Sequence, residues 1–113
     1  MLIICNGAFK SGSSWLHAIV VELTKLRKLN VVETPQKYTN DINSPGTIIE
    51  SRLQQFINNE DYIAENYLTK SHFFRESTLR KYYSTDVRIL FIERDMRDAI
   101  VSHFFHIRNK YRV

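Results

Sequence analysis

Cysteine is almost absent from this sequence, since Cys5 is the only one among 113 residues. No disulfide can therefore form within the chain, and a reducing compartment such as the cytoplasm is the expected location. Long apolar stretches are absent too, and no basic leader precedes the apolar residues after Met1, so we expect neither a membrane span nor a signal peptide. Hydrophobic residues make up 43% and charged residues 25% of the chain, a composition typical of one globular domain.

A dense basic stripe, which nucleic-acid-binding domains carry, is also missing. The net charge of +4 is instead concentrated in two segments. Residues 1–28 contain four basic residues and one acidic residue, and residues 88–113 contain six basic and three acidic residues. The segment 29–87 holds eight acidic and six basic residues. This distribution favours a small, highly charged anionic ligand over nucleic acid.

The first 15 residues combine a short apolar strand, a turn with two glycines and the start of a helix. Residues 2–5 are continuously apolar, as in a strand that is buried on both faces. Gly7 and Gly12 flank the turn, where the backbone must come close to another group. The free N–H groups of a helix start, close to Lys10, predict a site for a phosphate or a sulfate.

The glycine spacing matches the phosphate loop G-x-x-x-x-G-K-[ST], with Ser14 at its last position. Ser13 stands where that motif has its lysine, so the cation is relocated to Lys10 inside the loop. Either serine is also a candidate cap for the helix that follows. The alternative is an ordinary glycine–serine turn between a strand and a helix, with a solvated lysine.

Strand and helix patterns alternate along the rest of the chain. The expected elements are helices at 14–28, 47–58, 76–83 and 95–110, strands at 30–33, 67–71 and 87–92, and a polar loop at 34–46. This order predicts a parallel α/β sheet with right-handed crossovers, and ligands bind beyond the carboxyl ends of such strands. Lys10, the segment 70–72 and Arg94 all lie at or beyond the carboxyl ends of predicted strands. We expect Trp15 to anchor the first helix in the core, and the last helix to turn inward the side formed by Ala99, Ile100, His103, Phe104, Ile107 and Tyr111.

The segment from Lys10 to Trp15 resembles the Lys-Ser-Gly-Thr-Thr-Trp loop of sulfotransferases. In that family the loop holds the 5′-phosphosulfate of 3′-phosphoadenosine 5′-phosphosulfate (PAPS). Ala8 and Phe9 depart from the aromatic–proline pair that usually precedes the lysine. The resemblance implies that PAPS is bound by Lys10, Ser11, Gly12, Ser13, Ser14 and Trp15.

A second segment resembles the motif that binds the 3′-phosphate in the same family. Arg94 is followed eight residues later by Ser102, and Asp98 is retained between them, although the segment 95–97 departs from the usual Asn-Pro-Lys. An arginine fork matches phosphate oxygens in pairs. Eight residues of helix rise by about 12 Å, so the long arginine side chain must reach along the helix. A surface arginine paired with a nearby carboxylate is the alternative.

A third segment, Lys70-Ser71-His72, resembles the Lys-Thr-His segment of cytosolic-type sulfotransferases, whose histidine is the general base. A hydroxyl or amine acceptor is a weak nucleophile until its proton is removed, and histidine is suited to that task. The resemblance implies that His72 deprotonates the acceptor, that Lys70 supports the sulfuryl oxygens, and that Lys10 neutralises the leaving oxygen. The alternative for His72 is a structural residue at a strand end.

Together the three segments resemble the N-terminal half of a sulfotransferase, which moves a sulfuryl group from PAPS to a small-molecule or glycan acceptor. The resemblance implies a three-layer α/β fold with a parallel sheet, of the phosphate-loop nucleotide-hydrolase type. The fold is expected to be incomplete, because the later glycine-rich segment of the family is not present. Residues 1–113 are expected to form one nucleotide-binding domain. A fragment of a longer enzyme and a short chain of doubtful activity are both open.

Two other functions are compatible with the sequence. Glu93, directly after an apolar strand, could be a magnesium-site carboxylate in a phosphate-loop kinase, although the displaced lysine argues against this. A non-catalytic domain that only binds the nucleotide is the second. His103 and His106 lie three residues apart, but no carboxylate or thiol cluster accompanies them, so we expect no metal.

Overall fold

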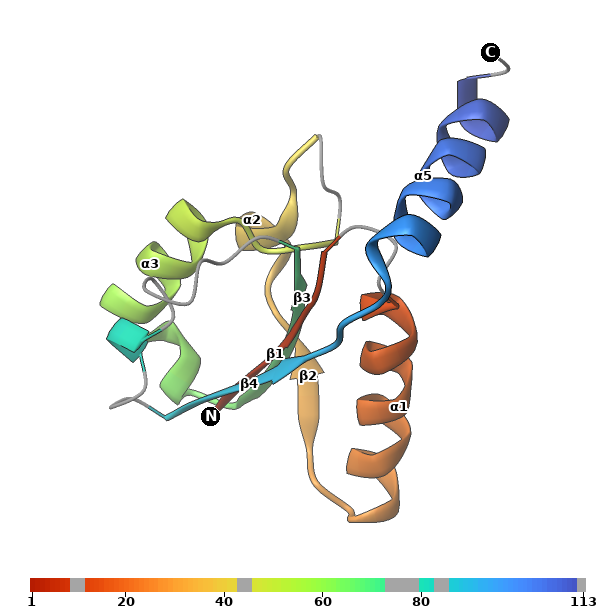
Figure 1. The fold of residues 1–113 in the computed structure, drawn as a ribbon. Coiled ribbons are helices and arrows are strands. Elements are labelled where there is room, and N and C mark those ends of the chain that lie inside the picture. Colours follow the sequence, from red (N-terminus) through yellow and green to blue (C-terminus); the bar gives the residue numbers. More distant parts are fainter. Residues whose placement is uncertain (9–11, 43–45, 73–79, 83–85, 112–113) are drawn as a thin grey trace.

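A computed structural model describes residues 1–8, 12–42, 46–72, 80–82 and 86–111. Four parallel strands form one sheet in the order β2-β3-β1-β4 (Figure 1). The strands are β1 (Leu2–Asn6), β2 (Val31–Glu33), β3 (Asn66–Ser71) and β4 (Val87–Phe91). The helices are α1 (Ser13–Leu26), α2 (Gln36–Thr39), α3 (Glu50–Asn58) and α5 (Met96–Tyr111), with 3₁₀ turns at Asp61–Ile63 and Arg80–Tyr82.

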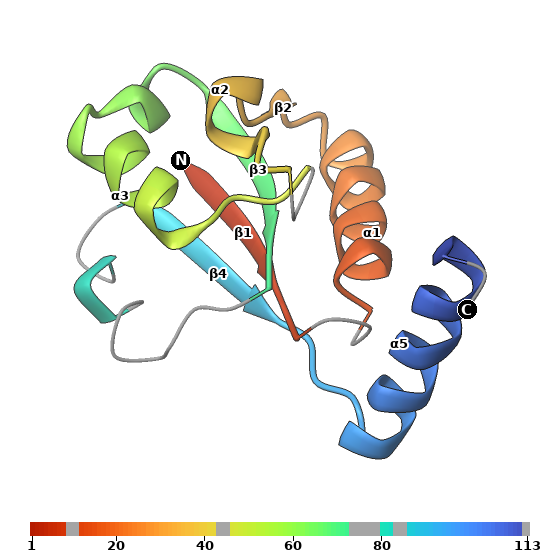
Figure 2. The same cartoon turned by 90° about the horizontal axis from the view of Figure 1, so that it is seen from above.

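The sheet lies between two helical layers, with α1 on one face and α2 and α3 on the other (Figures 1 and 2). Side chains of β1 alternate between these layers because successive strand residues point to opposite faces. Leu2 and Ile4 belong to the core on the α3 face, which centres on Phe56, whereas Ile3 and Cys5 pack on the α1 face. The predicted three-layer α/β fold with a parallel sheet is confirmed.

Cys5 is fully buried within this core. Burial, assisted by the negative charge of Glu33, raises the pKa of its thiol to about 11. The thiolate is the reactive form, so the folded protein is expected to resist alkylation by iodoacetamide at pH 8, whereas the unfolded chain reacts readily. Mass spectrometry with and without urea measures the difference. Fast labelling of the folded chain would contradict this burial.

Several predicted boundaries are corrected. The helix expected at 47–58 begins only at Glu50, because Thr47 forms a parallel bridge with Lys70 and the Ile48 N–H donates to the Lys70 carbonyl at 2.8 Å. The polar loop at 34–46 contains the short helix α2. Of the helix expected at 76–83, the structure describes a 3₁₀ turn at Arg80–Tyr82, and the rest of that range lies outside the described residues.

The predicted inward face of the last helix is wrong. None of the described side chains of α5 is buried, and Ile100, Phe104 and Tyr111 are each about 60% exposed. In both views α5 projects beyond the sheet (Figures 1 and 2). The apolar period of the sequence identifies one side of a helix but not what covers it. Among the described helices, none is long and apolar enough to cross a bilayer.

Candidate functional site

Three segments that the sequence analysis singled out meet at the carboxyl edge of the sheet. Asn6, which ends β1, lies opposite Ser71 of β3 on one side and Phe91 of β4 on the other. The chain therefore leaves these three strands at the same edge of the sheet (Figure 1). The segments that follow them are the loop that starts at Gly7, the residues after β3 and the link that contains Arg94. Lys10 and Ser11 lie outside the described residues.

Gly12 joins the loop to the start of α1. This glycine has a φ of 103°, a left-handed conformation that side chains with a Cβ rarely adopt. A Cβ placed on it would lie 3.1 Å from Cδ1 of Ile92. The N–H of Ile92 also donates to the Asn6 carbonyl at 2.9 Å. The end of the loop therefore lies against the end of β4, two residues before Arg94.

Gly12→Ala is expected to lower the free energy of unfolding by about 1–2 kcal/mol, because alanine is strained at positive φ. Gly46 offers a matched control, since its φ is 75° and no atom lies within 4 Å of an added Cβ. Urea denaturation of both alanine variants separates the backbone strain, which they share, from the contact with Ile92. A smaller loss for Gly12→Ala than for Gly46→Ala would contradict this close packing.

The start of α1 has no side-chain cap among the described residues. The prediction that Ser13 or Ser14 caps the helix is wrong, because the helix begins at Ser13 itself and Gly12 occupies the cap position. The first turn also lacks an acidic residue. No carboxylate of this turn therefore neutralises its N–H groups, which carry the positive end of the helix dipole.

The start of α5 provides a contrast within the same chain. There, Oδ1 of Asp95 accepts hydrogen bonds from the backbone N–H of Arg97 at 2.9 Å and from its Nε at 3.3 Å. These bonds lower the pKa of the Asp95 carboxyl. A carboxylate thus lies at the positive end of α5, whereas none of the described side chains caps the start of α1.

Lys70 brings a second positive charge to the start of α1. Its Nζ donates to Oγ of Ser14 at 3.4 Å, across 56 residues of sequence. The backbone of Lys70 is held from the other side, because its carbonyl accepts from Ile48. The side chain of Lys70, the second-last residue of β3, thus reaches the start of α1 at the carboxyl edge of the sheet.

His72 is half-buried and points back to the first residue of the loop. Its Nδ1 lies 3.1 Å from the Gly7 carbonyl oxygen. A carbonyl can only accept a hydrogen bond, so this contact requires the proton of a neutral ring on Nδ1. The basic lone pair of His72 is then on Nε2, as a general base at this edge needs.

The remaining predicted residues lie in α1, in α5 and in the link before α5. Arg94 is exposed in the link between β4 and α5, and Ser102 is half-buried on α5. Trp15 is 67% exposed, so the prediction that it anchors the core is wrong. Its position in the first turn of α1 leaves an exposed indole beside the uncapped N–H groups.

A buried polar pair, to which none of the three sequence motifs points, lies at the ends of β1 and β3. Asn6 and Ser71 are 5% and 0% exposed, and Oγ of Ser71 donates to Oδ1 of Asn6 at 2.5 Å. The sequence does contain an indication, because Asn6 is a polar residue that directly follows the apolar strand and precedes Gly7.

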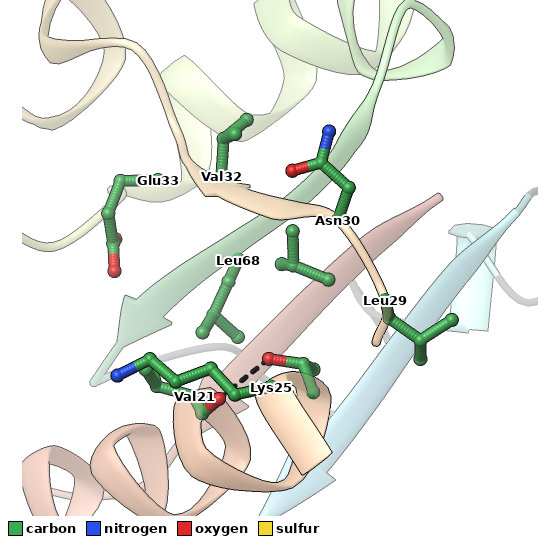
Figure 3. A pocket seen from close by; sticks show the side chains of 9 residues that line it. Val21, Lys25, Leu29, Asn30, Val32, Glu33 and Leu68 are labelled. Atoms are coloured by element: carbon green, nitrogen blue, oxygen red, sulfur yellow. Dashed lines mark hydrogen bonds between the residues drawn. The ribbon is translucent and has the colours of Figure 1, made fainter. Parts of the chain in front are cut away.

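A hollow of about 370 Å³ lies elsewhere, between the second half of α1 and β2 (Figure 3). Its two charges already have partners, since Lys25 lies 2.9 Å from Glu22 and Glu33 lies 2.8 Å from His17. It is at the opposite end of α1 from Gly12, so we do not assign the anion site to it. Its apolar walls include Val21, Leu29, Val31 and Leu68.

Within the described ranges, no group of three or more histidine, cysteine or acidic residues could hold a metal ion. The comparisons with curated proteins and with solved structures return no match. The sequence profile of the sulfotransferase domain matches residues 2–113, which include all three segments that carry the resemblance. The chain belongs to the sulfotransferase family.

Proposed function

We propose that this chain binds PAPS at the carboxyl edge of its sheet and transfers the sulfuryl group to a hydroxyl or amine of a small-molecule or glycan acceptor. The observation that supports this most is the convergence of an uncapped helix start, Lys70 and His72 at one edge. The single buried cysteine fits a reducing compartment, and we propose the cytoplasm as the location.

The 5′-phosphosulfate would lie against the start of α1. The backbone N–H groups of residues 11–15 and the Ser13 and Ser14 hydroxyls would donate to its oxygens, assisted by the helix dipole. Lys70, already in contact with Ser14, would support the sulfuryl oxygens. Lys10 would neutralise the charge that develops on the bridging oxygen. Catalysis of this kind depends on positioning and electrostatic stabilisation.

The transfer forms one S–O or S–N bond to the acceptor and breaks the S–O bond to the 5′-phosphate. Nε2 of His72 would take the proton of the acceptor, while the electron pair of the broken bond goes to the leaving phosphate oxygen. The contact between Nδ1 and Gly7 supports this role, since it directs the basic lone pair to Nε2.

Arg94 and Ser102 would recognise the 3′-phosphate, and Trp15 would contact the nucleotide. The backbone supports the first assignment, because Gly12 packs against Ile92 and so brings the loop close to the segment that contains Arg94.

Titration calorimetry with 3′-phosphoadenosine 5′-phosphate (PAP) and with adenosine 5′-phosphate (AMP) tests the nucleotide assignment. The wild-type chain is expected to prefer PAP, and Arg94→Ala is expected to weaken PAP binding about 10- to 150-fold without changing AMP binding. Arg88→Ala is the control, since Arg88 is an exposed arginine on β4 whose Nη1 lies 4.0 Å from Asp86. Equal affinity of the wild type for PAP and AMP would contradict the proposal.

Sulfuryl transfer from PAPS to a panel of hydroxyl and amine acceptors tests the reaction itself. Turnover without added metal is expected, because lysine takes the neutralising role. Binding of PAP without transfer to any acceptor would favour the non-catalytic alternative. Strict magnesium dependence with ATP, together with indifference to a 3′-phosphate, would favour a kinase.

A further inference from the structure

We propose that Asn6 and Ser71 are positioning residues, whose buried hydrogen bond holds the His72 ring in the tautomer with its proton on Nδ1. The importance of this tautomer for catalysis rests on the proposed function, whereas the tautomer itself can be measured without a substrate. Neither Asn6 nor Ser71 is among the residues that we expect to bind PAPS or to act as the base.

The pair of Asn6 and Ser71 is buried. Asn6 and Ser71 end neighbouring parallel strands and lie opposite each other in the register. Ser71 is fully buried and Asn6 is 5% exposed, so neither side chain is well solvated. The hydrogen bond of 2.5 Å between Oγ of Ser71 and Oδ1 of Asn6 is therefore costly to break, because water cannot easily replace it.

Two further hydrogen bonds connect this pair to His72. The carbonyl of Ser71 accepts from the Gly7 N–H at 3.2 Å, and the Gly7 carbonyl in turn accepts from Nδ1 of His72 at 3.1 Å. Gly7 and His72 directly follow Asn6 and Ser71 along the chain. Three hydrogen bonds thus join two adjacent dipeptides, and the last of them places a carbonyl acceptor at Nδ1 of His72.

Loss of the Ser71 hydroxyl is expected to disturb this arrangement. Without the Ser71 hydroxyl, Oδ1 of Asn6 is left in a buried place without this donor, so the strand ends must move apart or admit water. Gly7 is the next residue, and its carbonyl moves with them. The ring of His72 then loses the acceptor that selects its Nδ1–H form, and the Nε2–H form, which histidine prefers in water, becomes populated.

The test is long-range ¹H–¹⁵N NMR of the four histidines in the full chain, at a pH where the rings are neutral. The His72 signals are identified by their loss in His72→Gln. The wild type is expected to show only the Nδ1–H form of His72, and Ser71→Ala a mixture with the Nε2–H form. Ser71→Thr, which keeps the hydroxyl, is expected to restore the wild-type spectrum.

Thr34→Val is the matched control, since Thr34 is also buried. Its hydroxyl donates at 3.2 Å to the carbonyl of Leu68, which lies in β3 like Ser71. This substitution removes a comparable hydrogen bond three residues before Ser71 and should leave the His72 signals unchanged. Wild-type His72 signals in folded Ser71→Ala, or equal changes in Thr34→Val, would overturn the proposal.

Asn6→Ala removes the same bond from the other side and provides a second reading if Ser71→Ala does not fold. Unfolding of both variants, with Thr34→Val folded, would also overturn the proposal, because the pair would then serve the fold and not His72. If the chain transfers sulfate, Ser71→Ala should lower kcat by up to about 100-fold with the affinity for PAP unchanged. A failure to bind PAP contradicts the proposed function but leaves the tautomer result intact.

Discussion

His72→Ala is expected to lower the rate of sulfuryl transfer by about 10²- to 10⁴-fold, while the affinity for PAP stays within twofold of wild type. The reason is that Nε2 of His72 would contact the acceptor, whereas the nucleotide would be held by the loop and the start of α1. The contact between Nδ1 and Gly7 is lost as well, but it is made by the other nitrogen of the ring. Steady-state kinetics together with calorimetry measure the two effects separately.

His106→Ala is the control for this variant, since His106 is an exposed histidine on α5 and is not among the predicted site residues. It should leave both quantities unchanged. A parallel loss of turnover and PAP affinity in His72→Ala would count against a base role and would favour a structural histidine at the strand end.

Lys10→Ala is expected to have the second large effect, a loss of about 10²- to 10³-fold in turnover. A charge-assisted hydrogen bond to the 5′-phosphate would also be lost, so PAP and AMP should both bind about 10- to 150-fold more weakly. This pattern differs from that of Arg94→Ala, which should weaken PAP alone. The ratio of the two affinities therefore assigns each cation to its own phosphate.

Lys25→Ala controls for the general loss of positive charge, because Lys25 lies in the last turn of α1, far from its start, and pairs with Glu22. It should change neither affinity. If Lys10→Ala weakened PAP but not AMP, Lys10 would be acting on the 3′-phosphate, and the assignment of the loop would be wrong.

The strands and their shared edge could be predicted because the local patterns are strong. Residues 2–5 are continuously apolar, the glycine spacing follows them directly, and the segment 87–92 is apolar except for Arg88. In a parallel sheet all strands present their carboxyl ends on one side, so the alternation of elements was enough to place Lys70, His72 and Arg94 at one edge. The family profile confirms the family that the three segments indicated.

The features that could not be predicted depend on tertiary contacts. Trp15 and Phe104 look like core residues from their helical spacing, yet both are more than half exposed. Thr47 and Ile48 look like the start of a helix but pair with Lys70 in the sheet. The bond between Asn6 and Ser71 joins residues 65 positions apart, and no local pattern reports such a pairing.

The most direct test of the central claim is a crystal structure of the chain with PAP bound. We expect Lys10 to contact the 5′-phosphate and Arg94 the 3′-phosphate of the same nucleotide, with the 5′-phosphate against the first turn of α1. If Lys10 and Arg94 instead pointed into separate clefts, or if PAP occupied the hollow beside Lys25 and Glu33, the assignment of this edge as the nucleotide site would be wrong.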